Sequence, residues 1–269
     1  FGMLRAQRWL EASFLYWVNQ FPWAADNLNR EVTAIGAIGR LKLSDRIRLR
    51  VLPSPDLELP LLLQEASFDT FNFGTWAAHQ APFAALDQRV GSAAWDVAPP
   101  GRDARRLTLS LQHRRELALL PAPRGTRVVA SGAIAELQKN RFGTLMAEAP
   151  PGELRYTVES AYPLATEPPP VAGDVEVPAQ YQALLRQALA ETGAADLPPA
   201  DRAARVRRWF LDNFSYSLVQ GPGVGWRTPL ADFLTSTRRG HCEYFATAST
   251  LMLRAAGIPC PIVSGGSTP

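Results

Sequence analysis

Hydrophobic and polar residues alternate along short runs in the first half of the chain, at 45–52, 107–112 and 154–158. A period of two is that of a strand with one buried face. Turn signals separate the runs, among them the Pro-Pro-Gly sequences at 99–101 and 150–152. Strands that follow one another without intervening helices favour an antiparallel sandwich.

The pattern changes after residues 166–178, a stretch rich in proline and small residues that we interpret as a linker. Beyond it, apolar residues recur at helical spacing, first from Tyr181 to Leu189 and again from Ala203 to Phe214. Pro199, followed by Asp201, suits the first turn of the second helix. These patterns predict an α+β chain with the strands first and the helices second.

Residues 1–30 are unusually aromatic, with six aromatic side chains between Trp9 and Trp23. Their uncharged run, from Ala12 to Ala25, is shorter than the roughly 20 residues that span a bilayer. We predict a helical segment of juxtamembrane type, whose aromatic side chains lie at a membrane boundary or pack on the protein's own core. Because the chain begins with Phe1 and has no signal-peptide pattern, we expect a piece of a longer protein.

The predicted organisation therefore has four parts. They are the aromatic segment 1–30, a β-rich domain 31–165, the linker 166–178 and a second domain 179–269.

Composition narrows the class of protein. The chain is 46% hydrophobic and 20% charged, which excludes wholesale disorder. Its net charge is +3, but the arginines are scattered and no aromatic and basic signature accompanies them, so we predict no nucleic-acid partner. Two cysteines are too few for a structural zinc cluster. We find no cofactor or metal motif, since the glycines at 221–225 lack the lysine of a phosphate loop.

Cys242 is the strongest candidate for chemistry. Gly240 permits an unusual backbone before it, and residues 243–256 indicate a helix that stops at Gly257 and buries Phe245, Ala248, Met252 and Ala255. A cysteine at a helix N-terminus is favoured as the thiolate, which is the reactive form. The unpaired N–H groups there are candidates for an oxyanion hole.

The segment GHCEYFATASTLMLRAAGIP, at 240–259, resembles the nucleophile segment of the transglutaminase-like superfamily. The blocks at 214–216 and 232–234 are also similar to that family. Residues 39–47, 65–70 and Trp76 resemble the β-rich domain that precedes it in bacterial inner-membrane proteins. The resemblance implies the helical half of a papain-like core, a Cys-His-Asp triad, and a protein or peptide substrate. It also implies the periplasmic face of the inner membrane, with anchoring by flanking transmembrane segments outside this chain.

The triad is incomplete in this sequence. The histidines are His79, His113 and His241, and the family's histidine and aspartate come from strands downstream of the Ile-Pro segment at 258–259. His79 and His113 lie in the strand-rich half, and His241 is expected to position the loop. We therefore expect residues 1–269 to be inactive alone, and the apolar face of the cysteine helix to be covered by strands beyond Pro269 or by a neighbouring chain.

The expected neighbours of Cys242 are Tyr216, Trp226, His241 and Glu243. The two aromatic side chains have a simpler interpretation as core residues. Glu243 is expected to act as a first-turn acid or to pair with an arginine at 238–239.

Three further positions qualify the resemblance. Pro261 and Gly266 depart from the family pattern and put the start of the next strand in doubt. Cys260 is interpreted as a small apolar residue and not as a disulfide partner of Cys242, because a whole helix separates them.

Three functions remain open from the sequence. The first is acyl transfer from a protein glutamine to an amine through Cys242. The second is hydrolysis of the same thioester by a peptidase or amidase. The third is a periplasmic binding or scaffolding module, since the strand-rich half has no catalytic cluster.

Overall fold

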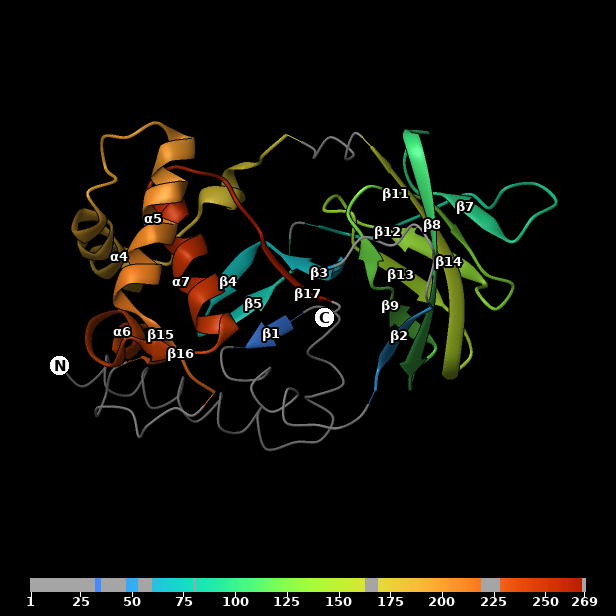
Figure 1. The fold of residues 1–269 in the computed structure, drawn as a ribbon, viewed down its shortest axis with the longest axis horizontal. Coiled ribbons are helices and arrows are strands. Elements are labelled where there is room, and N and C mark those ends of the chain that lie inside the picture. Colours follow the sequence, from blue (N-terminus) through green and yellow to red (C-terminus); the bar gives the residue numbers. More distant parts are fainter. Residues whose placement is uncertain are drawn as a thin grey trace. The chain divides into compact units, whose positions relative to one another are not determined.

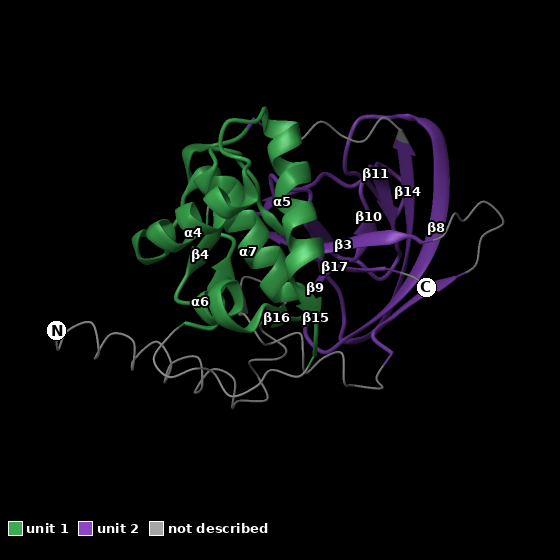
Figure 2. Ribbon diagram, turned by 60° about the vertical axis from the view of Figure 1, so that its left-hand side comes forward, with its two compact units in different colours: residues 1–44, 68–80, 170–262 green, residues 45–67, 81–169, 263–269 purple. Residues whose placement is uncertain are grey.

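The computed structural model describes residues 32–34, 47–52, 60–79, 81–162, 169–218 and 228–267. Figure 2 shows the two compact units that they form. Unit 1 consists of Phe1–Ser44, Phe68–Gln80 and Pro170–Ile262, and unit 2 of Asp45–Ser67, Ala81–Pro169 and Val263–Pro269. The predicted four-part division stays a prediction. It is continuous along the chain, whereas unit 1 takes residues 68–80 from the strand-rich half.

Unit 2 contains two larger sheets, both antiparallel, and a short third one (Figure 1). The five-stranded sheet has the order β2 (Leu49–Leu52), β8 (Arg102–His113), β14 (Gly152–Tyr162), β11 (Thr126–Ala130), β7 (Ala94–Asp96). The four-stranded sheet has the order β6 (Ala84–Ala85), β12 (Glu136–Lys139), β13 (Leu145–Glu148), β9 (Leu117–Leu119). A third, short sheet has the order β10 (Ala122–Pro123), β3 (Leu62–Phe68), β17 (Ile262–Ser267).

The alternating runs form the core of unit 2. Leu109 lies opposite Tyr156 across the β8–β14 pair, and both side chains are almost fully buried. Leu137 and Leu145, from the four-stranded sheet, belong to the same apolar cluster. The buried Tyr156 hydroxyl donates to the carbonyl oxygen of Pro121 at 2.6 Å. The predicted antiparallel sandwich, and with it the α+β fold class, is confirmed.

Unit 1 combines helices with small sheets (Figure 1). The helical elements are η1 (Ala172–Val175), α4 (Ala179–Thr192), α5 (Pro199–Asn213), α6 (Pro229–Asp232), η2 (Phe233–Thr237) and α7 (Cys242–Ala255). One sheet has the antiparallel order β1 (Val32–Ala34), β5 (Thr75–Ala77), β4 (Thr70–Asn72). The other pairs β15 (Ser215–Tyr216) with β16 (Arg239–Gly240) in parallel.

The two predicted helices after the linker are confirmed. Helix α5 begins at Pro199, as expected from its fixed φ, and buries Val206, Trp209 and Phe210. Helix α4 buries Tyr181 and ends before a left-handed glycine, Gly193.

The hairpin β4–β5 contacts helices α4 and α7, which the sequence did not predict. Phe71 packs against Tyr181 of α4, with ring centroids 5.7 Å apart. The indole Nε1 of Trp76 donates to the Thr247 hydroxyl of α7 at 2.9 Å. The expectation that α7 needs cover from beyond Pro269 or from a neighbouring chain is therefore wrong for this part of the helix.

Strand β17 forms despite Pro261 and Gly266, so the doubt about this strand is removed. It lies beside β3, and a Cβ at Gly265 would overlap the Leu63 carbonyl, so only glycine fits there. Among the described residues, no helix is long and apolar enough to cross a membrane. The aromatic segment 1–30 lies outside the described residues.

Candidate functional site

Cys242 is the first residue of α7, which confirms the predicted helix N-terminus. His241 precedes it with extended backbone, at φ −94° and ψ −177°. The carbonyl oxygen of His241 accepts from the backbone N–H of Tyr244 at 3.0 Å. The helix ends at Ala255, and Gly257 has a φ of 77°, the left-handed conformation expected after a helix. Cys242 is therefore partly exposed at the positive end of a 14-residue helix.

Gly240 is required for space, and not for the unusual φ that the sequence suggested. A Cβ at this position would lie 2.8 Å from the Cβ of Tyr244 and 3.0 Å from the ring of Phe233. Gly240 also accepts, through its carbonyl oxygen, from the N–H of Ser217 at 2.9 Å. The backbone before Cys242 is thus held between a strand on one side and aromatic side chains on the other.

Two ionisable side chains next to Cys242 are buried. His241 is 2% exposed and Glu243 is 8% exposed, and the Nδ1 of His241 lies 3.5 Å from the Oε2 of Glu243. Arg238, one of the arginines expected to pair with Glu243, instead pairs with Glu191 at 3.4 Å. Glu243 therefore lies beside the histidine that precedes Cys242.

An aromatic cluster supports this end of α7. Phe233 stacks near Phe210, Phe214 and Phe245 with ring centroids between 4.9 and 6.2 Å apart. Tyr244 joins it at 5.4 Å from Phe233. Burial raises the pKa of Tyr244, and the carboxylates of Glu243 and Asp232 raise it further. The cluster thus places a low-dielectric environment beside the buried His241.

Of the remaining predicted neighbours, Tyr216 is brought to the site by its backbone. It lies opposite Gly240 in the β15–β16 pair, while its side chain is 55% exposed, which does not support its simpler interpretation as a core residue. Trp226 lies outside the described residues.

The burial of α7 also differs in detail from the prediction. Ala248 and Met252 are buried, but Phe245 and Ala255 are only half-buried because the helix turns Thr247 and Leu251 inward.

The sequence reasoning missed Arg254, near the other end of α7. This side chain is 2% exposed, and its guanidinium lies over the ring of Trp76, 5.1 Å from the centroid. Its Nε donates to the Cys260 carbonyl at 2.8 Å, and its Nη1 donates to the Asp69 carbonyl at 2.6 Å. Burial lowers the pKa of Arg254, while nearby Cys260 and the carboxylate of Asp174 oppose that shift. An arginine inside the apolar run at 251–256 was the available signal.

The other histidines and the second cysteine lie elsewhere. His79 is exposed, and its backbone N–H donates to an Asp69 carboxylate oxygen at 3.1 Å. His113 belongs to unit 2. In the part of the chain that the structure describes, no hydrogen bond joins Cys242 to a histidine. Both thiols are free, so no disulfide joins Cys260 to Cys242, and burial raises the pKa of Cys260.

The described residues contain no group of three or more histidine, cysteine, aspartate or glutamate side chains placed to hold a metal ion.

The region that contains α7 is similar to known proteins. Residues 186–268 match the family model of the transglutaminase-like superfamily. A protein-glutamine gamma-glutamyltransferase of Pseudomonas aeruginosa is 41% identical over 81 residues, which are 30% of this chain and 11% of that protein. This chain therefore matches only a small part of the length of that relative.

Solved structures share the fold over a longer region. The crystal structure of the periplasmic domain of TgpA from Pseudomonas aeruginosa matches with a TM-score of 0.65 and 23% identity, over 87% of this chain and 78% of that one. The same domain bound to ethylmercury matches with a TM-score of 0.65 and 24% identity, over 87% and 80%.

Proposed function

We propose that this chain, whose residues 186–268 form a domain of the transglutaminase-like superfamily, carries the nucleophile of a cysteine-dependent acyltransferase that joins a protein glutamine to an amine. The observation that carries the proposal is the position of Cys242 as first residue of α7, inside the region that matches the family. The activity named for the Pseudomonas aeruginosa relative supports the same chemistry.

The proposed reaction has two stages. The Cys242 thiolate attacks the carboxamide carbon of a glutamine, and the tetrahedral oxyanion collapses with release of ammonia to leave a thioester. An amine then attacks the thioester, forms the new amide and returns the thiol. The N–H groups at the helix N-terminus are the candidate donors to the oxyanion.

The base for this reaction is not supplied by a described contact. His241 is buried and faces Glu243, which supports a positioning role for both residues beside Cys242. We therefore propose that residues 1–269 alone do not turn over, and that Tyr216 and Trp226 border the substrate. The likeness to periplasmic domains supports a periplasmic location, with attachment to the inner membrane as part of the same proposal.

The test is incorporation of a fluorescent amine into a glutamine-containing protein by the product of the whole gene. Cys242→Ala is expected to reduce incorporation by about a thousandfold or more, to background. Cys260→Ala, the matched control, should stay within about twofold because its thiol is partly buried and has no part in the reaction. Incorporation that persists in Cys242→Ala would overturn the proposal.

The same assay separates the alternatives. Ammonia release without amine incorporation would replace the transferase with a hydrolase that uses water as acceptor. No ammonia release, together with a Cys242 that a thiol-reactive amide analogue leaves unmodified, would favour the binding module.

A further inference from the structure

Unit 2 contains a cavity of 110 Å³ that we call the cationic cavity. Its lining includes Arg124, Lys139 and Arg141, together with the polar side chains of Gln64 and Thr126. Among the lining residues that the structure describes, none is an aspartate or a glutamate. Three basic side chains therefore border one small space.

Lys139 is the central cation. It is the last residue of β12, it is half-buried, and its Nζ donates to the Val97 carbonyl at 2.6 Å. Within the described ranges, no carboxylate forms an ion pair with Lys139. An ammonium has three N–H donors, so two remain after the bond to Val97. Burial lowers the pKa of Lys139 because the charged form is incompletely solvated there.

The walls of the cationic cavity are held by local hydrogen bonds. Asn140 accepts through its Oδ1 from the backbone N–H groups of Phe142 and Thr144, both at 3.0 Å. Gln64 donates through Nε2 to the Phe142 carbonyl at 2.9 Å. The guanidinium of Arg141 lies over the Phe142 ring, 3.9 Å from its centroid. These contacts fix the turn that carries Arg141, so a ligand would meet a largely preformed site.

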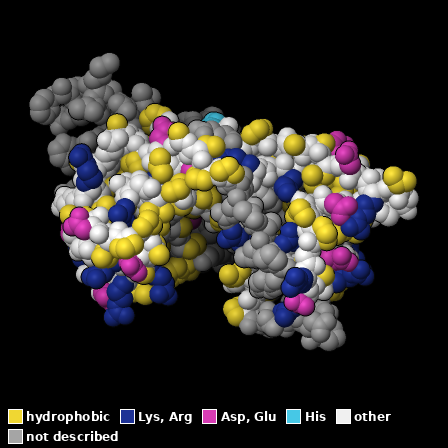
Figure 3. Space-filling model, turned by 90° about the horizontal axis from the view of Figure 1, so that it is seen from above, with side chains coloured by type: hydrophobic (Ala, Val, Ile, Leu, Met, Phe, Trp, Pro, Cys, Tyr) yellow, Lys and Arg dark blue, Asp and Glu magenta, His cyan; other side chains and the backbone are white. Residues whose placement is uncertain are grey.

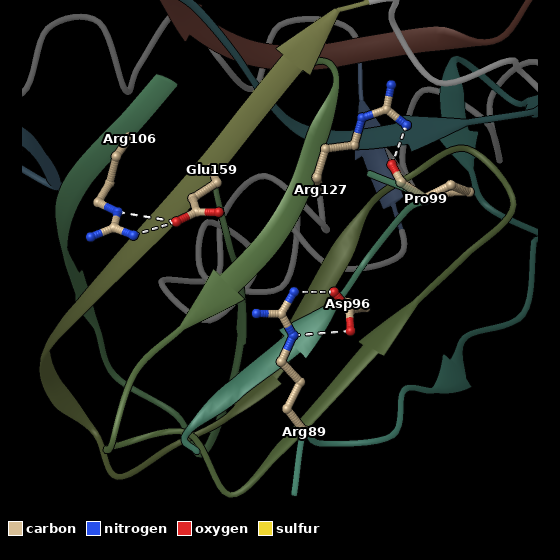
Figure 4. Close-up of polar contacts among 6 residues, drawn as sticks. All are labelled: Arg89, Asp96, Pro99, Arg106, Arg127 and Glu159. Carbon is tan, nitrogen blue, oxygen red and sulfur yellow. Dashed lines mark hydrogen bonds and ion pairs between the residues drawn. The ribbon is translucent and has the colours of Figure 1, made fainter. Parts of the chain in front are cut away.

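A neighbouring cavity of unit 2 is lined by both basic and acidic side chains. This space of 680 Å³ is lined by Arg89, Asp96, Arg127 and Glu159 among others. In Figure 4, Arg89 pairs with Asp96 at 2.5 and 3.0 Å, and Arg127 donates to the Pro99 carbonyl at 2.9 Å.

Arg106, on the adjacent strand β8, pairs with Glu159 in the same view. On the face of the molecule in Figure 3, basic and acidic side chains are likewise interspersed. Lys139 differs from Arg89 and Arg106, because its described partner is a carbonyl and not a carboxylate.

We propose that the cationic cavity binds a phosphate group, either a free phosphate or the end of a larger molecule such as a lipid headgroup. The volume suits a group of this size, because a water molecule occupies roughly 30 Å³ and sites for whole ligands are about 300–1,000 Å³. Lysine binds phosphate as a point charge, and guanidinium groups add directed donors. The inference is independent of the chemistry at Cys242, which belongs to unit 1.

Calorimetric titration of residues 1–269 with inorganic phosphate tests the proposal. Lys139→Gln is expected to weaken binding by roughly tenfold or more, because a charged hydrogen-bond donor is lost. Arg106→Gln is the matched control, since it removes one positive charge from the same unit at a side chain that is 72% exposed. It should leave binding within about twofold. Circular dichroism verifies that each variant is folded.

A second variant covers the case in which Lys139→Gln does not fold. Arg124 is exposed in its turn, and Arg124→Gln is expected to weaken phosphate binding by roughly threefold to tenfold. Absence of saturable phosphate binding, or equal binding by the folded cavity variant and Arg106→Gln, would overturn the proposal.

Two further titrations identify the ligand class and its source. Vesicles containing phosphatidic acid, compared with vesicles of phosphatidylcholine alone, test the lipid source. Lys139-dependent binding to the acidic vesicles assigns the headgroup, and Lys139-dependent binding to inorganic phosphate alone assigns the free ion. Acetate that saturates the site at the same concentration as phosphate would overturn the phosphate class.

Discussion

In unit 2 a single apolar cluster draws side chains from the five-stranded and the four-stranded sheets, whereas in unit 1 helix α7 buries charged and hydroxyl groups beside its apolar ones. The sheet core holds leucines such as Leu109, and its buried phenol, Tyr156, donates to a carbonyl. Helix α7 buries Glu243, Thr247 and Arg254. Buried polar groups cost desolvation and are tolerated where hydrogen bonds satisfy them. Burial of apolar surface therefore stabilises the cluster of unit 2, whereas specific polar contacts also hold α7 in position.

Arg254→Ala tests the polar side of this comparison and has the largest expected effect. The variant leaves the buried Asp69 carbonyl and the partly buried Cys260 carbonyl without their donor and removes the contact with Trp76. We expect a loss of about 3–5 kcal/mol in the free energy of unfolding, measured in urea. Arg208→Ala, an exposed member of an i, i+4 pair in α5, should cost less than about 0.5 kcal/mol. Equal losses in the two variants would show that the buried contacts do not hold α7.

Gly240→Ala tests the close packing before Cys242. The new methyl group would press on Tyr244 and Phe233, and overpacking of this kind costs about 1–3 kcal/mol. Gly132→Ala is the matched control, because no atom lies within 4 Å of its Cβ position. If thermal unfolding shows the same midpoint for both variants, the space at Gly240 is not limiting.

Tyr156→Phe tests a buried hydroxyl group of the sheet core. Loss of its bond to the Pro121 carbonyl is expected to cost about 1–2 kcal/mol at neutral pH. Burial, the larger cause, and the nearby Glu65 charge raise the pKa of Tyr156 in the folded protein.

This tyrosine therefore contributes stability below its unfolded pKa of about 10, and the contribution is lost as pH rises through the higher folded pKa. The difference in unfolding free energy between wild type and Tyr156→Phe should shrink from pH 9 to pH 11. A difference that grows over this range would contradict the assigned burial.

The smallest effect is expected for the reactivity of the two thiols, which can be measured without changing any side chain. Burial raises the pKa of Cys260 and lowers its thiolate fraction, whereas Cys242 is at a helix N-terminus. We expect iodoacetamide at pH 8 to modify Cys242 at least about fivefold faster, as followed by peptide mass spectrometry. Faster modification of Cys260 would be inconsistent with Cys242 as the nucleophile.

Local patterns were sufficient to predict much of the fold and one end of the site. The period of two identified β8 and β14, and Gly257 marked the end of α7. Both signals depend on neighbouring residues, so the sequence shows them directly.

Contacts between distant residues were not visible in the same way. Trp76 meets Thr247 across 171 positions, and Gln64 meets Phe142 across 78. No periodicity records such pairs, so neither the cover of α7 nor the cationic cavity was foreseen. Glu243 is a first-turn acid of α7, as one of the two expectations had it, but its approach to His241 was not foreseen because a helix end shows nothing of its burial.

The hairpin at 68–80 supplies contacts to the region that matches the family model. The family match begins at residue 186, whereas the indole that bonds Thr247 and underlies Arg254 belongs to residue 76. Residues 170–269 produced alone would expose the groups that Trp76 and Asp69 satisfy. A protein engineered to carry α7 is therefore expected to need the hairpin at 68–80 as well, although the two are far apart in the sequence.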